Sequence, residues 1–557
     1  MRLTFGELAI DCERRQLMRR GEEVHLSGKA FALLELLLLR RPNAVKRADI
    51  IRHVWPDTFV SPSNLATLVQ EIRDALNDDA RHPRFVKTIF AYGYAFIGEE
   101  NNGHQGAPGG SPVRSIAVLP FSIAGAKDAE YVADGITDSL ISALAEEPEV
   151  RVMARSTVFR FKDSRLTPQH VGRELRVDAV LVADIQRRGS RVTVAAELVS
   201  AEDGARLWGR RYERKASDLL GIENDLARGI SDALQLDRAP REKAPGGRKR
   251  DEAHTLYLRA QYAMNERTAA SIRSAADDFR RAIAMDQSYA PPYAALADTF
   301  TLSARYVEVP IADLAACARE AAETALDLDP SLPEGHVSMA SVHDTCDWNW
   351  PAAEQEYRKA IALRPGDVLA HQWYALLLTR LGRAEEAGEQ MQIALRLDPL
   401  SPRLNLSAAN MHYYAGRYDE AASFCARAVA LDPLFPFAHL QMALIRVQQT
   451  LYDDARTSLQ ASGFSAAAVA ARAAVCAREG DTVAAEAIMA QMPARGAEYE
   501  LAVVAAALCK NALALQSLER ACAQRNIYAS YARVDPLLLP LHGKRRFAAV
   551  LRQAGLS

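Results

Sequence analysis

Along the first hundred residues, stretches with the two-residue hydrophobic period of a strand occur together with stretches that have the period of a helix. Residues 2–10 and 15–26 alternate apolar and polar side chains, so they are expected to form short strands with a turn at Gly21. Three helices are expected where apolar residues recur every three or four positions: 28–41, 46–54 and 62–77. Residues 85–97 are expected to form a final strand pair, with Gly93 near its turn. Together these elements predict a winged helix–turn–helix, a variant of the motif that places its last helix in the major groove of DNA.

The third expected helix has two distinct faces. Leu65, Val69, Ile72 and Leu76 recur at helical spacing, so they form one stripe that faces the core. The opposite side carries polar side chains: Ser63, Asn64, Thr67, Gln70 and Glu71. Asn and Gln suit adenine, Ser and Thr suit several bases, and Glu accepts a hydrogen bond from cytosine. These five residues are the candidate base contacts, and an ordinary solvated helix face is the alternative.

Basic residues supply the second part of the candidate site. Residues 1–100 hold 15 Lys and Arg against 14 Asp and Glu, a net charge of +1, which is a weak electrostatic footprint for a DNA-binding domain. Phosphate or wing contacts are expected around the second helix, the third helix and the final hairpin: Lys46, Arg47, Arg52, Arg73, Arg84, Lys87, Thr88 and Tyr92. Because one copy with this charge would bind DNA weakly, a homo-oligomer on DNA or a second contact is expected.

The middle of the chain mixes strand and helix periods. Residues 115–121 form an apolar run typical of a buried strand. Three further strands are expected in 178–214, with turns at Gly189–Ser190 and Asp203–Gly204. The other expected elements are a strand over 150–159 and helices over 129–146, 168–175 and 217–235. Together they predict an α/β module.

We find no constellation of catalytic residues in the sequence. Glu130, Asp134 and Asp138 have the spacing to hold a cation, but a metal site needs more convergent ligands, so the charged start of a helix is the favoured interpretation. No phosphate-binding loop, nucleophile elbow or zinc-protease motif occurs in the right context. We therefore expect no catalytic residue, no metal and no cofactor.

The last part of the chain repeats every 34 residues. Three sets of equivalent positions show this step: Ala360, Ala394 and Ala428; Ala353, Ala387 and Ala421; and Pro365, Pro399 and Pro433. Gly382 and Gly416 fall in matching GRAEEA and GRYDEA segments, where a glycine ends the first helix of each pair. This period is the tetratricopeptide signature, and about eight helical hairpins are expected over 251–557.

Aromatic and histidine side chains gather in two adjacent repeats. The set comprises His343, Trp348, Trp350, His371 and Trp373. These side chains either line a ligand groove or pack in the core and turns of the hairpins, and packing is favoured.

Composition indicates the class of protein and the positions of the linkers between its domains. The 557 residues are 49% hydrophobic and 25% charged with a net charge of −2, as in a folded chain of several domains rather than a polycation. Residues 101–112 and 237–250 are rich in Gly, Pro and polar residues, so they are expected linkers between domains at 1–100, 113–236 and 251–557. No signal peptide or apolar run of about 20 residues is found, and the seven Cys form no CxxC pair. A cytoplasmic protein that does not enter a membrane is expected.

The first hundred residues resemble the OmpR/PhoB-type winged-helix family. The likeness is carried by VHLSGKAFALLELLLLR, Val54–Trp55, VSPSNLATLVQEIRDAL and FVKTIFAYGYAF, in that order. It implies sequence-specific binding to double-stranded DNA through the helix at 62–77, with the hairpin as a wing in the adjacent minor groove. Wing positions that are often basic in relatives hold Phe90, Ala91 and Tyr92 here. The family often carries an upstream receiver domain, and this sequence begins with the DNA-binding segment, so a one-component regulator is expected.

The order of the parts resembles that of HilA/CadC-like regulators. Residues 115–236 resemble the TolB-N-terminal-like module through IAVLPF, DGITDSLISAL, VDAVLVADIQRRG and RVTVAAELVSAEDGARLWGRRYER. The expected fold class is multidomain α+β: a winged helix–turn–helix, a central α/β module and an all-α tetratricopeptide superhelix. The resemblance implies a transcriptional regulator that binds DNA, with RNA polymerase and a protein or peptide on the concave face of the superhelix as candidate partners. The alternatives are a protein–protein scaffold whose winged helix no longer binds DNA and, third, a nucleotide-linked signalling enzyme.

Overall fold

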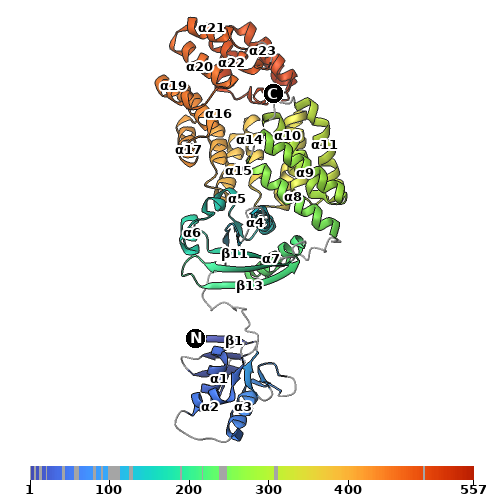
Figure 1. The fold of residues 1–557 in the computed structure, drawn as a ribbon. Coiled ribbons are helices and arrows are strands. Elements are labelled where there is room, and N and C mark those ends of the chain that lie inside the picture. Colours follow the sequence, from blue (N-terminus) through green and yellow to red (C-terminus); the bar gives the residue numbers. More distant parts are fainter. Residues whose placement is uncertain are drawn as a thin grey trace. The chain divides into compact units, whose positions relative to one another are not determined.

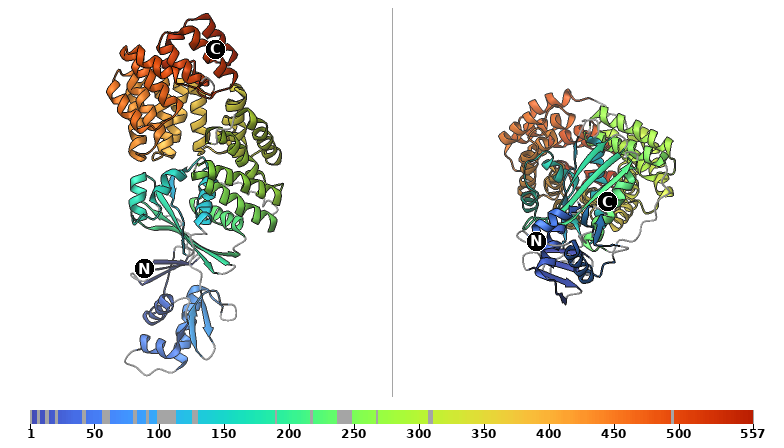
Figure 2. Two further views of the ribbon diagram at one scale, coloured as in Figure 1. Left: turned by 45° about the horizontal axis from the view of Figure 1, so that its top comes forward. Right: turned by 60° about the horizontal axis from the view of Figure 1, so that its bottom comes forward.

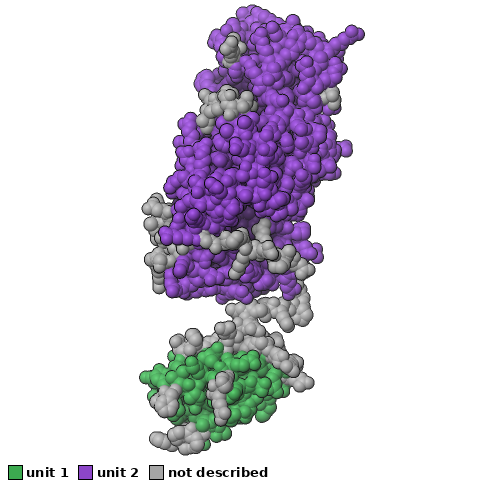
Figure 3. All heavy atoms as spheres, turned by 90° about the vertical axis from the view of Figure 1, so that its right-hand side faces the viewer, with its two compact units in different colours: residues 1–110 green, residues 111–557 purple. Residues whose placement is uncertain are grey.

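The chain forms two compact units, residues 1–110 and 111–557 (Figure 3). The structure is a computed structural model, and it describes residues 2–5, 8–11, 15–19, 22–40, 44–55, 62–79, 83–89, 92–97, 113–124, 130–188, 191–215, 218–236, 248–266, 268–306, 311–493 and 496–556. No helix in this described part of the chain is both long and apolar enough to cross a bilayer.

Unit 1 is a winged helix–turn–helix, as the sequence predicts (Figure 1). Four strands form an antiparallel sheet in chain order: β1 (Arg2–Phe5), β2 (Leu8–Asp11), β3 (Gln16–Arg19) and β4 (Glu22–Val24). Three helices follow: α1 (Gly28–Arg40), α2 (Arg47–Val54) and α3 (Pro62–Leu76). A second sheet has the order β5-β7-β6 and contains β5 (Val45–Lys46), β6 (Val86–Ile89) and β7 (Gly93–Phe96).

The two alternating stretches at the N-terminus form four short strands. The expectation of one strand over 2–10 is wrong, because β1 and β2 pair antiparallel with Leu3 opposite Ile10. In the stretch 15–26, β3 and β4 pair antiparallel on either side of the expected turn position, with Leu17 opposite Val24, and Gly21 itself lies outside the described residues. The apolar positions change phase between Phe5 and Leu8, and this shift is the signal in the sequence for two strands rather than one.

The core of unit 1 lies between α1, α3 and the terminal hairpin. Leu65, Val69, Ile72 and Leu76 of α3 are at most 2% exposed, which confirms the stripe expected to face the core. Gly93 lets β5 join the hairpin, because a Cβ at this position would lie 1.9 Å from the carbonyl oxygen of Val45. The hairpin and α3 are therefore fixed to one hydrophobic core.

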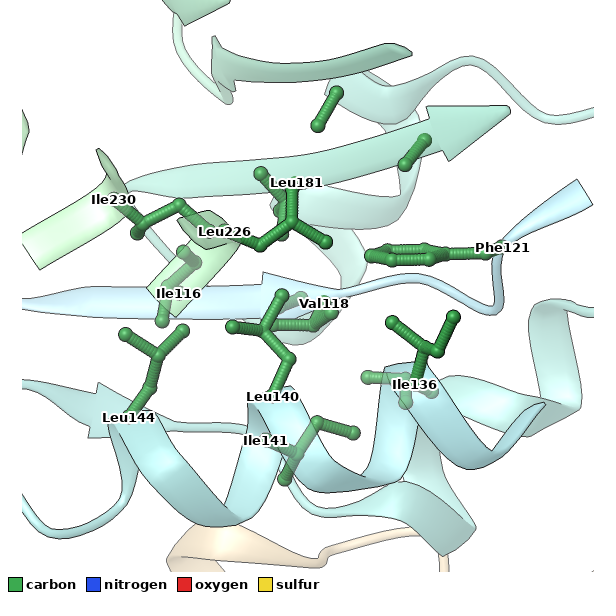
Figure 4. Packing of buried hydrophobic residues seen from close by; sticks show 14 of the residues in the cluster. Ile116, Val118, Phe121, Ile136, Leu140, Ile141, Leu144, Leu181, Leu226 and Ile230 are labelled. Carbon is green, nitrogen blue, oxygen red and sulfur yellow. The ribbon is translucent and has the colours of Figure 1, made fainter. Parts of the chain in front are cut away.

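Unit 2 begins with a mixed sheet of order β10-β8-β11-β12-β13, in which β9 also pairs with β11. The strands are β8 (Ser115–Val118), β9 (Ser122–Ala124), β10 (Arg151–Val152), β11 (Ala179–Arg188), β12 (Arg191–Ser200) and β13 (Arg206–Lys215). The helices are α4 (Glu130–Leu144), α6 (Pro168–Leu175) and α7 (Leu219–Leu234). Leu140 and Leu144 of α4 point toward Ile116 and Val118 of β8 in the core of this α/β module (Figure 4).

The strand expected over 150–159 is two residues long. After β10 the chain forms a short helix, α5 (Arg155–Val158), and a turn of 3-10 helix, η2 (Phe159–Phe161). The Ala154 N–H donates to the Leu397 carbonyl over 2.9 Å, and the Thr157 hydroxyl donates to Asp398 over 2.7 Å. The sequence gives no sign of this change, because the groups that fix the backbone lie more than 200 positions away along the chain.

Helical hairpins make up the rest of unit 2 and stack in chain order (Figure 1, Figure 2). The described residues form eight pairs: α8 (Arg248–Glu266) with α9 (Ala269–Met285), α10 (Ala290–Tyr306) with α11 (Ile311–Leu328), α12 (Pro333–Ser341) and its extension η3 (Val342–Asp347) with α13 (Trp350–Leu363), α14 (Val368–Arg380) with α15 (Ala384–Leu397), α16 (Pro402–Tyr414) with α17 (Tyr418–Leu431), α18 (Pro436–Gln448) with α19 (Tyr452–Ala461), α20 (Ala466–Glu479) with α21 (Thr482–Ala490), and α22 (Glu498–Ala507) with α23 (Asn511–Ala523). The first helices of later pairs contact one another, α14 with α16 and α16 with α18, so they form the inner layer. A tetratricopeptide-like array is therefore present, as expected.

The glycines at the 34-residue step end the first helices, as predicted. Gly382 and Gly416 have φ of 74° and 73°, in the left-handed region that glycine adopts at low cost. Trp348 and Thr450 occupy the same step in the neighbouring hairpins and have φ of 56° and 61°. The turn geometry thus recurs even where the glycine does not.

The segment after the last hairpin packs back onto earlier hairpins. It contains η4 (Ala529–Tyr531), η5 (Pro536–Leu541) and α24 (Arg545–Gln553). The Tyr531 ring stacks on Tyr414 with centroids 4.6 Å apart, and the Trp350 Nε1–H donates to the Ala554 carbonyl over 2.9 Å. Trp350 is therefore a packing residue, and His371 is likewise held by Gln390 and the Pro365 carbonyl. Packing, the favoured interpretation of this aromatic and histidine group, holds for both residues.

Candidate nucleic-acid interface

The outer face of α3 exposes three of the five candidate base contacts. Asn64, Thr67 and Gln70 are exposed, and they lie opposite the buried stripe of Leu65 and Val69. The amide of Gln70 donates to the Asp74 carboxylate over 2.8 Å, an exposed contact one helical turn away. Ser63 belongs to α3, and its side chain lies outside the described residues. The face therefore presents amide and hydroxyl groups that suit base edges.

Glu71 has a structural task. Its carboxylate accepts hydrogen bonds from the Ser27 backbone N–H over 2.6 Å and from the Ser27 hydroxyl over 3.0 Å. Ser27 precedes α1, and its own hydroxyl accepts from the Ala30 N–H, as a helix N-cap does. Both carboxylate oxygens of Glu71 thus hold α1 to α3. We therefore assign Glu71 this structural role in place of the expected contact with a base.

Arg73 also departs from the expected role. Its side chain is turned inward, the residue is only 7% exposed, and its guanidinium donates to the Val86 carbonyl and the Thr88 hydroxyl, each over 2.9 Å. A buried guanidinium that bonds β6 does not reach a phosphate. Arg73 therefore fixes the wing to α3, and the expectation of a phosphate contact from it is corrected to a positioning role.

The wing and the start of α2 form a small basic surface. Lys46, Arg47, Arg84, Lys87 and Thr88 are exposed. Tyr92 is 42% exposed, the Lys46 Nζ lies 5.8 Å from its ring centroid, and its carbonyl accepts from the Arg47 N–H over 3.0 Å. Phe90 and Ala91, the other wing positions singled out in the sequence, lie outside the described residues.

Arg52 is the last of the expected phosphate contacts. Its side chain is 79% exposed, and its guanidinium lies 3.6 Å from the Asp49 carboxylate. Such an exposed pair contributes little to stability, so the guanidinium can exchange Asp49 for a phosphate at small cost.

Asp78 is a positioning residue that the sequence reasoning missed. Its carboxylate accepts from three successive backbone N–H groups, those of Arg84, Phe85 and Val86, over 2.6, 3.2 and 2.7 Å. These bonds set the start of β6 just beyond the end of α3. An Asp after a helix end is the signal that was available, since this residue type often bonds nearby backbone N–H groups.

The acidic residues at the start of α4 are engaged with a lysine. The Lys162 Nζ lies 2.6 Å from Glu130 and 2.8 Å from Asp134, and burial raises the pKa of Asp138. Across the described residues, no group of three or more His, Cys, Asp or Glu side chains has the arrangement of a metal site.

Two family models match the chain. The model described as transcriptional regulatory protein, C terminal, matches residues 21–96, which hold α1, α2, α3 and the wing. Unit 1 contains an OmpR/PhoB-type winged-helix domain. The model described as HilA/YgeH-like transcriptional regulator, second domain, matches residues 112–219, which hold the sheet that follows the winged-helix domain.

Relatives of three kinds are similar to parts of this chain. The transcriptional regulator HilA of Salmonella typhimurium is 23% identical over 405 residues, which cover 72% of this chain and 71% of that protein. The transcriptional regulatory protein PcoR of Escherichia coli is 35% identical over 92 residues, 16% of this chain and 40% of that protein. A Rhizobium meliloti protein provisionally named adenylate cyclase 3 is 30% identical over 233 residues, 41% of this chain, and the match spans 39% of that relative's length.

Solved structures resemble the two units separately. The Klebsiella pneumoniae RstA DNA-binding domain, in complex with the RstA box, is 28% identical, with 17% of this chain and 95% of that chain covered at a TM-score of 0.16. A tetratricopeptide repeat protein of Parabacteroides merdae is 16% identical, with 48% of this chain and 100% of that chain covered at a TM-score of 0.35.

Proposed function

We propose that the protein is a sequence-specific DNA-binding transcriptional regulator whose helical array receives a protein partner or signal. The observation that carries this proposal is the outer face of α3. Within a domain that matches a transcriptional-regulator model, Asn64, Thr67 and Gln70 are exposed while the opposite stripe is buried. A helix with this division presents hydrogen-bonding side chains to a major groove. Its site of action is the compartment that holds the DNA, the bacterial cytoplasm.

The remaining contacts fall to the basic surface around the wing. Lys46, Arg47, Arg52, Arg84 and Lys87 are exposed and have the charge to meet phosphates on either side of the groove. Thr88 and Tyr92 are exposed on the wing, where they can contact the sugar–phosphate backbone of DNA. A net charge of +1 over residues 1–100 gives each copy a weak electrostatic contribution, which favours binding as a homo-oligomer.

A double substitution on α3 tests the base contacts. In the full chain, Thr67→Ala with Gln70→Ala removes groups that reach base edges and leaves the buried stripe intact. We expect the preference for a duplex selected from a random pool over a mixed-sequence duplex to fall by about 1–3 kcal/mol for each lost pair of bonds. Competition binding by fluorescence anisotropy at fixed salt measures this preference.

A matched control is available in the array. Thr457 and Gln460 are exposed on α19 with the same spacing, so Thr457→Ala with Gln460→Ala makes the same chemical change away from the winged helix. If the α3 variant keeps the parent's preference, as the α19 variant should, then α3 does not read the bases and the proposal fails.

A protein–protein scaffold remains the second candidate, because the charge of residues 1–100 is close to neutral. A scaffold that has lost DNA would show no selected duplex and no change of affinity with salt concentration. The relative with a cyclase name motivates the third candidate, a nucleotide-linked enzyme. Turnover of ATP by the pure protein with Mg²⁺ would support an enzyme, and we expect none.

The partner of the array must meet a surface that the chain itself partly covers. Arg380 and Tyr414 lie on first helices, and both contact Tyr531 of the returning C-terminal segment. A protein or peptide that binds the inner layer at these hairpins would have to displace Tyr531. RNA polymerase is one candidate for a partner on the remaining surface.

A further inference from the structure

The edge strand of the sheet in unit 2 is strongly basic. β13 is the last strand in the order β10-β8-β11-β12-β13, and Figure 1 shows it at the margin of the sheet. Half of its ten residues are basic and one, Glu213, is acidic. The basic strip is defined as these five residues: Arg206, Arg210, Arg211, Arg214 and Lys215. All five are exposed, so the strip places positive charge along a sheet edge that faces solvent.

Nearby acids engage only part of the basic strip. Arg206 lies 3.5 Å from Glu197, and Arg214 lies 2.6 Å from Asp225 of α7. Glu213, the acid within the strand, pairs over 2.5 Å with Arg191 of β12. Arg210, Arg211 and Lys215 have no salt-bridge partner among the described residues, although Glu213 lies between Arg211 and Lys215 in the strand and interacts electrostatically with Arg211.

The register adds a like-charge contact at Lys215. Lys215 is directly opposite Arg191 across the antiparallel pair, and Arg211 is opposite Ala195. Like charges that face each other across a sheet destabilise it, and the Glu213 carboxylate, 2.5 Å from Arg191, offsets part of this repulsion. Arg211 and Lys215 point to the same side because they are four residues apart in a strand, and they are separated by about 13 Å. That distance is close to the width of the DNA major groove, about 12 Å.

Protection of the edge is the competing explanation. Charged side chains on an edge strand prevent it from pairing with another chain, and either sign of charge does this. The sign therefore separates the two explanations, because edge protection is indifferent to it and a phosphate contact is not.

We propose that the basic strip binds the phosphate backbone of double-stranded DNA and adds sequence-independent affinity to that of the winged helix. The inference rests on the proposed function, since the same duplex is read by α3. It supplies the charge that residues 1–100 lack. Lys and Arg that neutralise phosphates release counterions, so each contact appears in the salt dependence of binding and not in sequence preference.

Charge reversal in the full chain tests the strip. Arg211→Glu with Lys215→Glu keeps the edge charged, and it places a glutamate opposite Arg191, so neither edge protection nor folding should suffer. The probe is a mixed-sequence 40-bp duplex, with Kd measured over a series of salt concentrations. We expect at least a tenfold loss of affinity at 0.1 M salt and a slope of log Kd against log salt that is shallower by about two. The neutral variant Arg211→Gln with Lys215→Gln should show the same salt slope as the charge-reversed variant, with a smaller loss of affinity.

The control changes the net charge equally in the array. Arg273 of α9 and Arg396 of α15 are exposed, and no ion pair among the described residues engages them, so Arg273→Glu with Arg396→Glu should keep the parent's slope. The inference is overturned if the strip variant and this control have the same dependence of log Kd on log salt. Sequence preference in the strip variant should equal that of the parent, whereas Thr67→Ala with Gln70→Ala should lose preference and keep the slope. Selective binding with an unchanged slope therefore refutes the strip alone, and a parent that binds no duplex refutes both proposals.

Discussion

Helices α3 and α14 carry polar side chains of similar kinds and use them in opposite ways. On the outer face of α3, Asn64, Thr67 and Gln70 are exposed. On α14, Arg380 is 2% exposed and pairs with Asp344, which is equally buried, while the Thr379 hydroxyl bonds the Ala375 carbonyl. The Arg380 and Thr379 side chains of α14 are buried and bonded within the array, whereas the Asn64, Thr67 and Gln70 side chains of α3 are exposed to solvent.

This difference separates stability from recognition. A buried charge that loses its partner costs several kcal/mol, whereas an exposed amide or hydroxyl can be removed at almost no cost to folding. Substitutions of the buried polar residues of α14 should therefore destabilise the array, and those on the outer face of α3 should change DNA binding alone.

The largest expected effect is at Arg380. Arg380→Ala leaves the buried Asp344 carboxylate without its partner and removes the cation from the Tyr531 ring, 5.1 Å away. We expect unit 2 to lose about 3–5 kcal/mol of unfolding free energy. Denaturant titration followed by far-UV circular dichroism measures this loss. Arg396→Ala, an exposed change on α15, is the control, and equal midpoints for the two variants would show that the buried pair does not hold the array.

An intermediate effect is expected at Glu71, on the side of α3 that faces α1. Glu71→Ala removes the acceptor for the Ser27 N–H and hydroxyl, so α1 should fray at its first turn. The expected cost is about 1–2 kcal/mol, for the loss of two part-buried hydrogen bonds to a carboxylate while the Ser27 cap itself remains. Hydrogen exchange of the α1 amides in the full chain measures it. Gln70→Ala, one residue away on the exposed face, should leave the same amides unchanged, and similar exchange in both variants would contradict the division of α3 into two faces.

The smallest expected effect concerns pH and His336. The hydrogen bond from its Nδ1 to Glu356, over 2.6 Å, raises the pKa of His336. A raised folded pKa means that the stabilisation is complete below the unfolded value of about 6.5 and is lost as pH rises through the folded pKa. We expect the Tm of the parent to fall by about 1–2 °C over this window relative to His336→Asn. If the Tm of the two proteins changed with pH in parallel between pH 5.5 and 8.5, the bond between His336 and Glu356 would not stabilise the fold.

The sequence predicts those features that repeat or alternate locally. The stripe from Leu65 to Leu76 and the turns at Gly382 and Gly416 follow from spacing alone, and the structure has both. The pattern also predicts the wing hairpin over 85–97, which β6 and β7 form.

What the sequence does not predict depends on partners far along the chain. Glu71 looks like any polar residue on a helix until Ser27, 44 positions earlier, is placed beside it. Arg73 has a charge that suits phosphate, and only the fold shows that Val86 and Thr88 hold it. Periodicity distinguishes buried from exposed apolar residues, but it does not tell a polar side chain that meets water from one that meets another part of the protein.

The bond between Trp350 and Ala554 sets an order of events during synthesis. The two residues are 204 positions apart, so a ribosome that adds about 5–20 residues per second needs roughly 10–40 s to make the acceptor after the donor. Throughout that interval the indole of Trp350 is without its acceptor, while the winged helix, made first, has had time to fold. The winged-helix domain of a nascent chain can therefore be folded well before the C-terminal segment packs onto the helical array. If synthesis stalled in this interval, the folded winged helix would be attached to an array that lacks this contact.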